Sequence, residues 1–403
     1  MANENRVVVT GLGTVAPGCR GTDGFLARLL SGDSAIGPLT SGAAAGMGDR
    51  VGAEVELIDK RSLGMSRKEL RYLDVVSTYG LIAAQEAVAS AGLDTDLELE
   101  REELGFSVGL FSGPLSLSRH ESNVNLFSAA MSAYYGSVIG NITIPLRICG
   151  PSSTHLNLDL AGTDAIGYGY ELVRHGKARA VVAGGSDSGF NAFVLSRLQE
   201  AGVLSNGGGR SGPAGGQAGP GSGGVALGEG AALLVLESLE SAESRGQEIH
   251  AEVLGYQTAS NGCAPAAIEA ALAKAGLPPA AVDCIVANAT GFAEIDRREV
   301  EAVRRVFGDA GTQPWTTSIT WAVGHTLGAA GALQAVASTL ILKHQQVPPV
   351  GQPAAARERS GLNLVGPPGV AGSVRVVLQS SFGFSGKASF LVLGRYERSA
   401  GDG

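Results

Sequence analysis

The sequence predicts an α/β protein, because short apolar strands alternate with amphipathic helices along most of the chain. Two stretches carry this prediction. Arg6–Gly13 (RVVVTGLG) has the pattern of a buried strand that ends in a glycine turn, and Gly150–Gly185 has the pattern of a strand, a tight turn, a helix and a second strand. From about Ile249 a further series of strands and helices follows in a similar order, which predicts two similar halves, 1–248 and 249–403.

Composition narrows the class of protein. The chain has 403 residues, of which 44% are hydrophobic, 17% are charged and 60 are glycine, so it is long enough for a large, closely packed core. The net charge of −8 argues against a nucleic acid or an anionic membrane as partner. The longest apolar run, Ala329–Leu342, is interrupted by Gln334 and is too short to span a bilayer.

The N-terminus and the cysteines indicate the compartment. The chain passes directly from MANEN into the strand at Arg6, without the apolar segment of a signal peptide. Four cysteines show no paired spacing, which is typical of reduced thiols; they are Cys19, Cys149, Cys263 and Cys284. We therefore expect a cytoplasmic protein.

The first half divides into recognisable elements. Ser66–Gly92 is predicted to be one long helix, and Phe106–Leu110 is predicted to be a strand. Residues expected to face inward from that helix are Leu73, Val76, Tyr79, Leu81, Ala84 and Val88. Asn123–Gly140 is also predicted to be helical. Its apolar face is explained equally well as plain core or as a functional surface, and consists of Leu126, Phe127, Ala130, Met131 and Tyr134. Asn206–Gly224 consists almost entirely of Gly, Ser, Ala and Pro and is predicted to be a flexible surface loop.

The second half repeats this alternation. Its predicted elements are Ala251–Tyr256, Pro265–Ala275, Asp283–Ala287, Glu299–Phe307, Ala329–Leu342, Arg375–Ser380 and Ser389–Leu393. The last strand follows a glycine-rich turn, Phe382–Gly386 (FGFSG).

The central stretch resembles a known family. Gly150–Gly185 is similar to the nucleophile region of β-ketoacyl synthases, and Arg6–Gly13 is similar to the start of those enzymes. The resemblance covers nearly the whole chain and implies the thiolase-like fold, a five-layered αβαβα arrangement of two similar halves. It implies no cofactor and no metal. Two departures are a short connection at Gln257–Ala264 and the reduction of a longer family motif to Gly228–Gly230.

The resemblance also places the site residues. Asp159 lies where the family carries its acyl-accepting cysteine, and a carboxylate cannot replace a thiolate there because it is a poor nucleophile. Asn288 lies in place of the first histidine, and Thr320 lies in place of the supporting lysine. Only the second histidine remains, as His325 in GHTLGAAGA. No catalytic set is intact, so the resemblance implies a ketosynthase scaffold without its chemistry.

Simpler interpretations exist for the remaining polar residues. His325 without its partners is better explained as a structural histidine that hydrogen-bonds the backbone. Asp159 has the residue type of a helix cap. Cys149 is not a replacement nucleophile, since it lies ten residues upstream of the turn.

A ketosynthase scaffold without its nucleophile resembles chain-length factors, the β subunits of type II polyketide synthase ketosynthases. This resemblance implies a heterodimer with a catalytic ketosynthase, contact with an acyl carrier protein through that complex, and a shared acyl tunnel. Spacing back from Asp159 places the tunnel candidates at Leu126, Ala129, Met131 and Tyr134. Aromatic members commonly carry glutamine in place of the cysteine, whereas the retained Gly324–Gly328 motif favours a reducing, polyene-forming system.

Two other functions stay open from the sequence. One is a carrier-protein-dependent decarboxylase or acyltransferase that uses His325 and Asp159 on a thioester. The other is a homodimeric acyl-binding protein without a partner ketosynthase.

Overall fold

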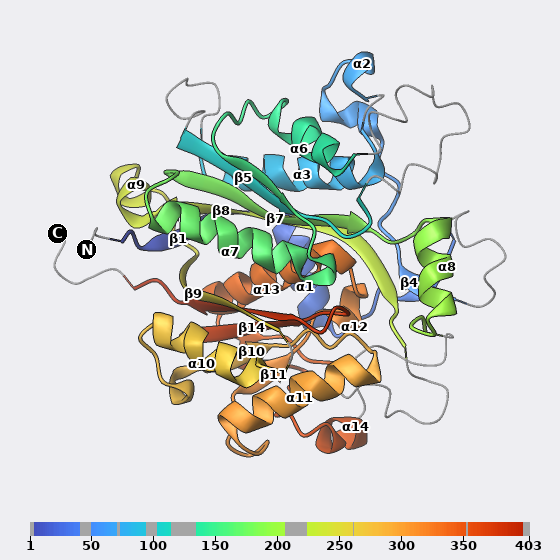
Figure 1. Ribbon diagram of the computed structural model, residues 1–403, viewed down its shortest axis with the longest axis vertical. Helices are drawn as coiled ribbons and strands as arrows, with labels where there is room; N and C mark the ends of the chain where they lie inside the picture. The colour runs from blue at the N-terminus through green and yellow to red at the C-terminus, as the bar shows by residue number, and fades with distance from the viewer. Residues whose placement is uncertain are drawn as a thin grey trace.

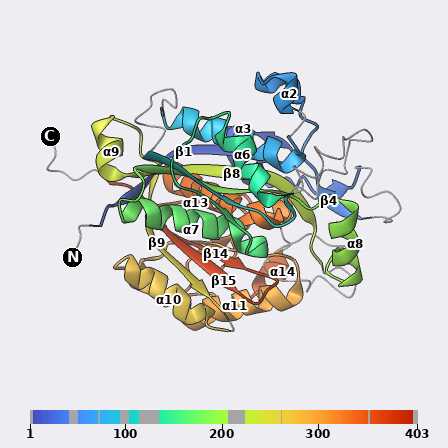
Figure 2. The ribbon, with the colours of Figure 1, turned by 45° about the horizontal axis from the view of Figure 1, so that its top comes forward.

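The computed structural model describes residues 4–40, 50–70, 73–93, 103–113, 134–205, 224–260, 262–351 and 354–397. Its architecture is the five-layered arrangement that the family resemblance implies (Figure 1). Helices α3 and α6 cover one sheet, α7 and α13 lie between the two sheets, and α10 and α11 cover the other sheet. Figure 2 shows the same central position of α7 and α13 from a second direction.

The first sheet has the order β1-β8-β7-β5-β6. Its strands are β1 (Val7–Ala16), β5 (Leu104–Gly109), β6 (Ser152–His155), β7 (Ala180–Ser188) and β8 (Leu227–Ser238). The β1–β8 and β8–β7 pairs are antiparallel, whereas β5 pairs in parallel with both β7 and β6. The edge strand β6 therefore leads directly into the turn that carries Asp159.

The second sheet has the order β9-β15-β14-β10-β11 and is joined to the first by the antiparallel pair β1–β9. Its strands are β9 (Ala251–Ala259), β10 (Cys284–Val286), β11 (Trp315–Thr317), β14 (Val376–Phe382) and β15 (Ala388–Gly394). Five short strands lie outside these two strand orders: β2 (Cys19–Arg20), β3 (Gly37–Pro38), β4 (Val51–Ala53), β12 (Gln346–Val347) and β13 (Val370–Ala371).

The helices complete the layers. The longer ones are α1 (Gly21–Ser31), α3 (Val75–Ser90), α7 (Ala161–Arg174), α10 (Ala264–Lys274), α11 (Ala293–Phe307) and α13 (Ala330–His344). Shorter ones are α2 (Arg67–Leu70), α6 (Tyr135–Thr143), α8 (Ala192–Glu200), α9 (Leu239–Ser244), α12 (Thr320–Val323) and α14 (Ala354–Arg359). Single 3-10 turns are η2 (Lys60–Leu63), η4 (Leu158–Leu160), η5 (Pro279–Ala281) and η6 (Leu327–Ala329).

Two glycines allow the backbone contacts that place the site. A Cβ on Gly109 would lie 2.1 Å from the Ala161 carbonyl carbon, so the start of α7 packs directly on β5. A Cβ on Gly162 would lie 2.6 Å from the Gly328 carbonyl oxygen. The first turn of α7 and the η6 turn before α13 are therefore in direct contact at the centre of the molecule.

One helix prediction was wrong in its bounds. Ser66–Gly92 is not a single helix: α2 covers Arg67–Leu70, and α3 begins only at Val75. The cause is Asp74, whose carboxylate accepts the Ser77 N–H at 2.8 Å and caps a new helix. The inward residues predicted for this stretch are all buried, from Leu73 to Val88.

The second helix prediction is only partly testable. Residues 123–133 of the predicted helix Asn123–Gly140 lie outside the described residues, and α6 begins at Tyr135 and ends at Thr143. Tyr134, expected on an apolar face, is 72% exposed at the N-terminus of α6. Most of the predicted loop Asn206–Gly224 also lies outside the described residues.

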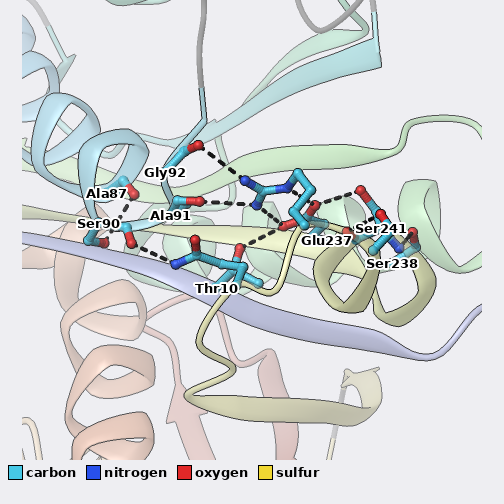
Figure 3. Close-up of polar contacts among 11 residues, drawn as sticks. Thr10, Ala87, Ser90, Ala91, Gly92, Glu237, Ser238 and Ser241 are labelled. Atoms are coloured by element: carbon cyan, nitrogen blue, oxygen red, sulfur yellow. Dashed lines mark hydrogen bonds and ion pairs between the residues drawn. The ribbon is translucent and has the colours of Figure 1, made fainter. Parts of the chain in front are cut away.

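A buried ion pair ties the first sheet to α3 and α9 (Figure 3). The Glu237 carboxylate, on β8, accepts hydrogen bonds from Thr10 at 3.0 Å and from Ser241 at 2.6 Å. The Arg245 guanidinium donates to both carboxylate oxygens, at 3.1 and 2.9 Å. Its remaining N–H groups donate to the Ala91 and Gly92 carbonyls just after α3. Each charged group is thus paired and hydrogen-bonded, as burial requires.

None of the helices within the described residues is long and apolar enough to cross a membrane.

Candidate functional site

The four positions singled out in the sequence lie in turns that meet where the two sheets face each other. Asp159 lies in η4 between β6 and α7, and Asn288 follows β10 directly. Thr320 begins α12, and His325 follows α12. Phe382, at the end of β14, and Phe384, in the turn between β14 and β15, connect them.

A continuous series of contacts joins the four residues. The Thr320 hydroxyl donates to the Asn288 carbonyl oxygen at 2.7 Å, and the Asn288 side-chain amide donates to the Phe382 carbonyl oxygen at 2.7 Å. The Phe384 N–H donates to the Asp159 Oδ1 at 3.2 Å. The Phe384 ring meets the His325 ring edge to face, with centroids 5.9 Å apart. The structure therefore brings Asp159, Asn288, Thr320 and His325 into one buried cluster.

Asp159 is a buried carboxylate whose charge is not neutralised by a cation in the described part of the chain. It is 2% exposed, and its Oδ2 has no hydrogen-bond partner among the described residues. Burial raises its pKa to about 7, while hydrogen bonds from the backbone N–H groups of Phe384 and of Asp159 itself act in the opposite direction. The N-cap of α7 is Leu160, so Asp159 is not the cap of that helix.

His325 is buried and neutral. It is 0% exposed, and burial lowers its pKa to about 4. Its Nδ1 accepts the Leu327 N–H at 3.4 Å, a backbone contact that fits the structural interpretation, and this leaves the ring proton on Nε2. Nε2 has no partner within the described ranges. The ring is therefore a hydrogen-bond donor at neutral pH and carries no positive charge.

The side chains of Asn288 and Thr320 hydrogen-bond backbone carbonyl groups and do not line a cavity surface that is exposed to solvent. Both are 3% exposed, and their side chains are engaged by the contacts to Phe382 and Asn288 already described. An amide and a hydroxyl satisfy these neighbours without a charge. The pair consequently supplies neither a proton shuttle nor a cation.

Two buried carboxylates behind Asn288 were not identified from the sequence. Glu299, on α11, accepts the N–H groups of Asn288 and Ala289 at 2.9 Å each and the Ser380 hydroxyl. Asp296 accepts the Thr290 hydroxyl at 2.8 Å and the Gly291 N–H at 3.0 Å. Neither forms an ion pair with a described residue. Their sequence signal is the spacing of three residues within the first turns of α11, directly after NATG.

These carboxylates keep their protons more readily than free ones. Burial first, and the neighbouring Glu299 second, raise the pKa of Asp296 to about 8, and burial raises the pKa of Glu299. The site therefore contains three carboxyl groups in low-dielectric surroundings and an uncharged threonine where the resemblance places a lysine.

Strained backbone marks the same turns. Leu158 (φ +54°), Ala289 (φ +45°) and Leu327 (φ +49°) have left-handed conformations and lie within two residues of Asp159, Asn288 and His325, respectively. Such conformations cost about 1–3 kcal/mol each and persist where the surroundings fix them. The surroundings therefore fix the backbone of all three turns in these conformations.

The tunnel candidates are mostly untested. Leu126, Ala129 and Met131 lie outside the described residues, and Tyr134 is exposed beside α6. No group of three or more metal-ligating His, Cys, Asp or Glu side chains occurs in the part of the chain that the structure describes.

The arrangement allows binding more readily than covalent catalysis. An acyl transfer needs a nucleophile that attacks a thioester, with a base or cation that activates it. Asp159 is a weak nucleophile, His325 is neutral, and its ring is not hydrogen-bonded to Asp159 in the described contacts. What remains is a set of hydrogen-bond donors and acceptors around Phe384.

Comparisons with known proteins agree with this architecture. The model for the β-ketoacyl synthase N-terminal domain matches residues 4–242, and the model for the C-terminal domain matches residues 242–352. A putative polyketide β-ketoacyl synthase 1 from Streptomyces halstedii is 30% identical over 98% of this chain and 99% of its own length. A 3-oxoacyl-[acyl-carrier-protein] synthase 2 from Synechocystis sp. is 29% identical over 98% of this chain and all of its own length.

Solved structures resemble the chain over similar lengths. The ishigamide ketosynthase/chain length factor has a TM-score of 0.86 at 28% identity and covers 98% of this chain and 100% of its own. A type II polyketide synthase acyl-carrier protein in complex with its ketosynthase, AntDE:AntF, gives a TM-score of 0.82 at 25% identity, with coverage of 98% and 100%. The chain belongs to the β-ketoacyl synthase family and has its thiolase-like fold.

Proposed function

We propose that the chain is a catalytically inactive ketosynthase-like subunit, a chain-length factor, that pairs with a catalytic ketosynthase and shapes an acyl tunnel to set polyketide chain length. The observation that carries this proposal is the buried, unneutralised carboxylate of Asp159 at the nucleophile turn. The Asp159 side chain has no sulfur, so it cannot hold an acyl group as a thioester, and its Oδ1 already accepts the Phe384 N–H. Asn288 and Thr320 lie where the resemblance places the first histidine and the lysine, and neither side chain carries a charge.

An exposed apolar face favours a protein partner. Five large apolar side chains around the edge strand β6 and the adjacent helices are between 38% and 74% exposed: Tyr134, Ile144, Leu156, Leu158 and Tyr168. The described part of β6 pairs with β5 on one side only, so its other edge is available for pairing. Exposed apolar groups beside an open strand are typical of an interface. We expect the partner to cover this face, which flanks Asn141–Ser153, and an obligate pair to bury more than about 2,000 Å².

The similar structures favour the same kind of partner. One is named as a ketosynthase/chain length factor, and another holds an acyl-carrier protein with its ketosynthase. By analogy we propose a catalytic ketosynthase as the direct partner and an acyl carrier protein as the partner of the complex. The Gly324–Gly328 motif leads us to place the pair in a reducing, polyene-forming system.

A second candidate function rests on two unpartnered atoms. Asp159 Oδ2 and His325 Nε2 are buried and lack hydrogen-bond partners in the described part of the chain, so both atoms are available to hydrogen-bond a substrate. A carrier-protein-dependent decarboxylase would use such groups on a thioester carbonyl.

A homodimeric acyl-binding protein would instead cover the β6 face with a second copy of the chain.

Coexpression with a cysteine-containing homologue encoded beside this chain tests the proposal. We expect a heterodimer by sedimentation, and elongation activity that requires both proteins. Leu156→Glu, on the exposed face, should weaken the pair, whereas Phe193→Glu on α8, which is 62% exposed, should leave it intact. A stable homodimer that ignores the partner would favour the third function.

Restoring the nucleophile alone should not create a synthase. Asp159→Cys leaves Asn288 and Thr320 unchanged, and the loss of one oxyanion-stabilising donor typically costs about 10²–10³ in rate. The triple variant Asp159→Cys, Asn288→His, Thr320→Lys is the comparison. Efficient elongation by the single variant would refute the assignment of Asn288.

The tunnel role has its own test, which rests on the sequence. Ala129→Phe should shorten the polyketide made by the pair and leave the heterodimer intact by gel filtration, because a bulky side chain would block the shared tunnel. An unchanged chain length in an intact complex would remove this segment from the length-setting role.

A further inference from the structure

Asp187 is a fully buried acidic residue that takes part in none of the contacts described above. It is the next-to-last residue of β7 and is 0% exposed. Its carboxyl oxygens accept the backbone N–H groups of Phe111 at 2.5 Å, Ser112 at 3.1 Å, Ser188 at 2.9 Å and Gly328 at 3.0 Å, and also contact the Ser112 hydroxyl. Burial raises its pKa, and these hydrogen bonds act in the opposite direction. The carboxyl group thus satisfies four buried backbone donors that would otherwise lack this acceptor.

The donors come from two segments that are far apart in the sequence. Phe111 and Ser112 follow the end of β5, whereas Gly328 lies in the η6 turn, 141 residues after Asp187. The contact is close enough to require glycine at position 328, since a Cβ there would lie 2.5 Å from the Asp187 Oδ2 and 2.6 Å from the Phe111 nitrogen. Asp187 therefore joins the end of β5 directly to the η6 turn.

The η6 turn in its place covers one nitrogen of His325. The Leu327 N–H donates to the His325 Nδ1 at 3.4 Å, and Leu327 has the left-handed φ of +49° that only fixed surroundings maintain. The next residue is Gly328, whose N–H Asp187 accepts. Leu327 and Phe111 also pack in one apolar cluster with Phe384, against which the His325 ring lies. Both segments held by Asp187 therefore surround the histidine of the candidate site.

We propose that Asp187 is a positioning residue of the candidate site: by joining the end of β5 to the η6 turn, it keeps the Leu327 N–H on the His325 Nδ1 and the ring in its buried place beside Phe384. Asp187 acts through the backbone of Gly328 and Leu327, and no described contact joins it to the imidazole itself. The inference holds for each of the candidate functions, because it concerns how the chain orders its own site.

Chemical labelling of His325 in the full chain tests the proposal. Diethyl pyrocarbonate attacks the unprotonated nitrogen of a neutral imidazole, and in His325 this nitrogen is the Nδ1 that the Leu327 N–H covers. In the wild-type protein, labelling of His325 should therefore be far slower than labelling of the exposed His344. Asp187→Ala removes the acceptor of the Gly328 N–H, so labelling of His325 at pH 7.5 should become about tenfold faster or more, as measured by peptide mass spectrometry.

Asp74→Ala is the matched control. It removes a carboxyl group that is also buried, at 2% exposure, and that caps α3 through the Ser77 N–H. Both variants are labelled at the same interval below their melting temperatures, and each rate is divided by that of His344, so a general loss of stability acts on both alike. A folded Asp187→Ala protein with the wild-type labelling rate at His325 would overturn the proposal. Equal acceleration in Asp74→Ala would indicate general loosening and would overturn it as well.

Hydrogen exchange on the wild-type chain covers the case in which Asp187→Ala does not fold. Among the described residues, Asp187 is the acceptor of both the Phe111 and the Gly328 N–H, so the protection of these amides reports on its carboxyl group. Both amides should exchange slowly. Exchange of either amide at the rate of an unstructured peptide would show that Asp187 does not join the two segments, which would refute the proposal.

Discussion

Glu237 and Asp159 are both buried carboxylates, but the chain surrounds them in opposite ways. Glu237 receives two donors from Arg245 and one each from Thr10 and Ser241, so its charge is neutralised within the fold. Asp159 Oδ1 accepts the backbone N–H of Phe384, and its Oδ2 has no partner in the described ranges. The first arrangement is that of a structural ion pair. The second leaves a buried carboxylate without a cation among the described residues, as expected if the catalytic side chains proposed for this site have been replaced.

The largest loss of stability should follow from breaking the buried ion pair between Glu237 and Arg245. Arg245→Met leaves Glu237 buried without its cation and removes the contacts to Ala91 and Gly92. Loss of one partner of a buried pair costs about 3–5 kcal/mol, which urea denaturation would measure. The control is Arg197→Met, in an exposed pair with Glu200, where the change should stay below about 1 kcal/mol. A similar loss of stability in both variants would show that the Glu237–Arg245 pair contributes no more than an exposed ion pair.

The second effect concerns pH. Burial raises the pKa of Asp159 to about 7, so the folded state holds this proton more tightly than the unfolded state. Its contribution to stability is fully present below about pH 4 and is lost as the pH rises through about 7. Between pH 5 and 8, the free energy of unfolding of the wild type should fall by about 2–3 kcal/mol more than that of Asp159→Asn.

Other titrating groups do not obscure this comparison. His325 and Asp296 are present in both proteins, so their effects cancel in the difference between the two stability curves. Parallel curves across this pH range would show that Asp159 titrates as an ordinary carboxyl group.

A smaller effect on stability tests how closely the surrounding atoms pack against Asp159. Gly383→Ala adds a methyl group 3.0 Å from Asp159 Oδ1, and overpacking of this kind costs about 1–3 kcal/mol. Gly136→Ala, in α6, is the control because its Cβ would meet nothing within 4 Å, and the helix should gain up to about 1 kcal/mol. Equal stability of the two alanine variants would indicate free space beside Asp159.

The sequence predicted the turn that carries Asp159 because its signals are local. A short strand of mixed apolar and polar residues, small residues at Ala161 and Gly162, and helical spacing of Ile166 and Tyr170 all lie within a short stretch, and the structure has β6, η4 and α7 there. The same local reasoning gave the buried face of α3 but overlooked Asp74 as a helix cap.

The sequence could not predict contacts that join distant segments. Phe384 and Asp159 are 225 residues apart, and their hydrogen bond exists only because two sheets bring their turns together. Asp296 and Glu299 have the spacing of a solvated helix face, and burial beneath Ser380 makes them part of the site instead. The four site positions were identified through the resemblance to a family, whereas their hydrogen bonds required coordinates.

The central claim is that this chain does not carry an acyl group. Intact-protein mass spectrometry tests it most directly, after the chain and its partner ketosynthase are incubated with acyl- and malonyl-loaded carrier protein. We predict an added acyl mass on the partner and an unchanged mass for this chain, because Asp159 is a buried, hydrogen-bonded carboxylate. A covalent acyl adduct on any residue of this chain would contradict the claim.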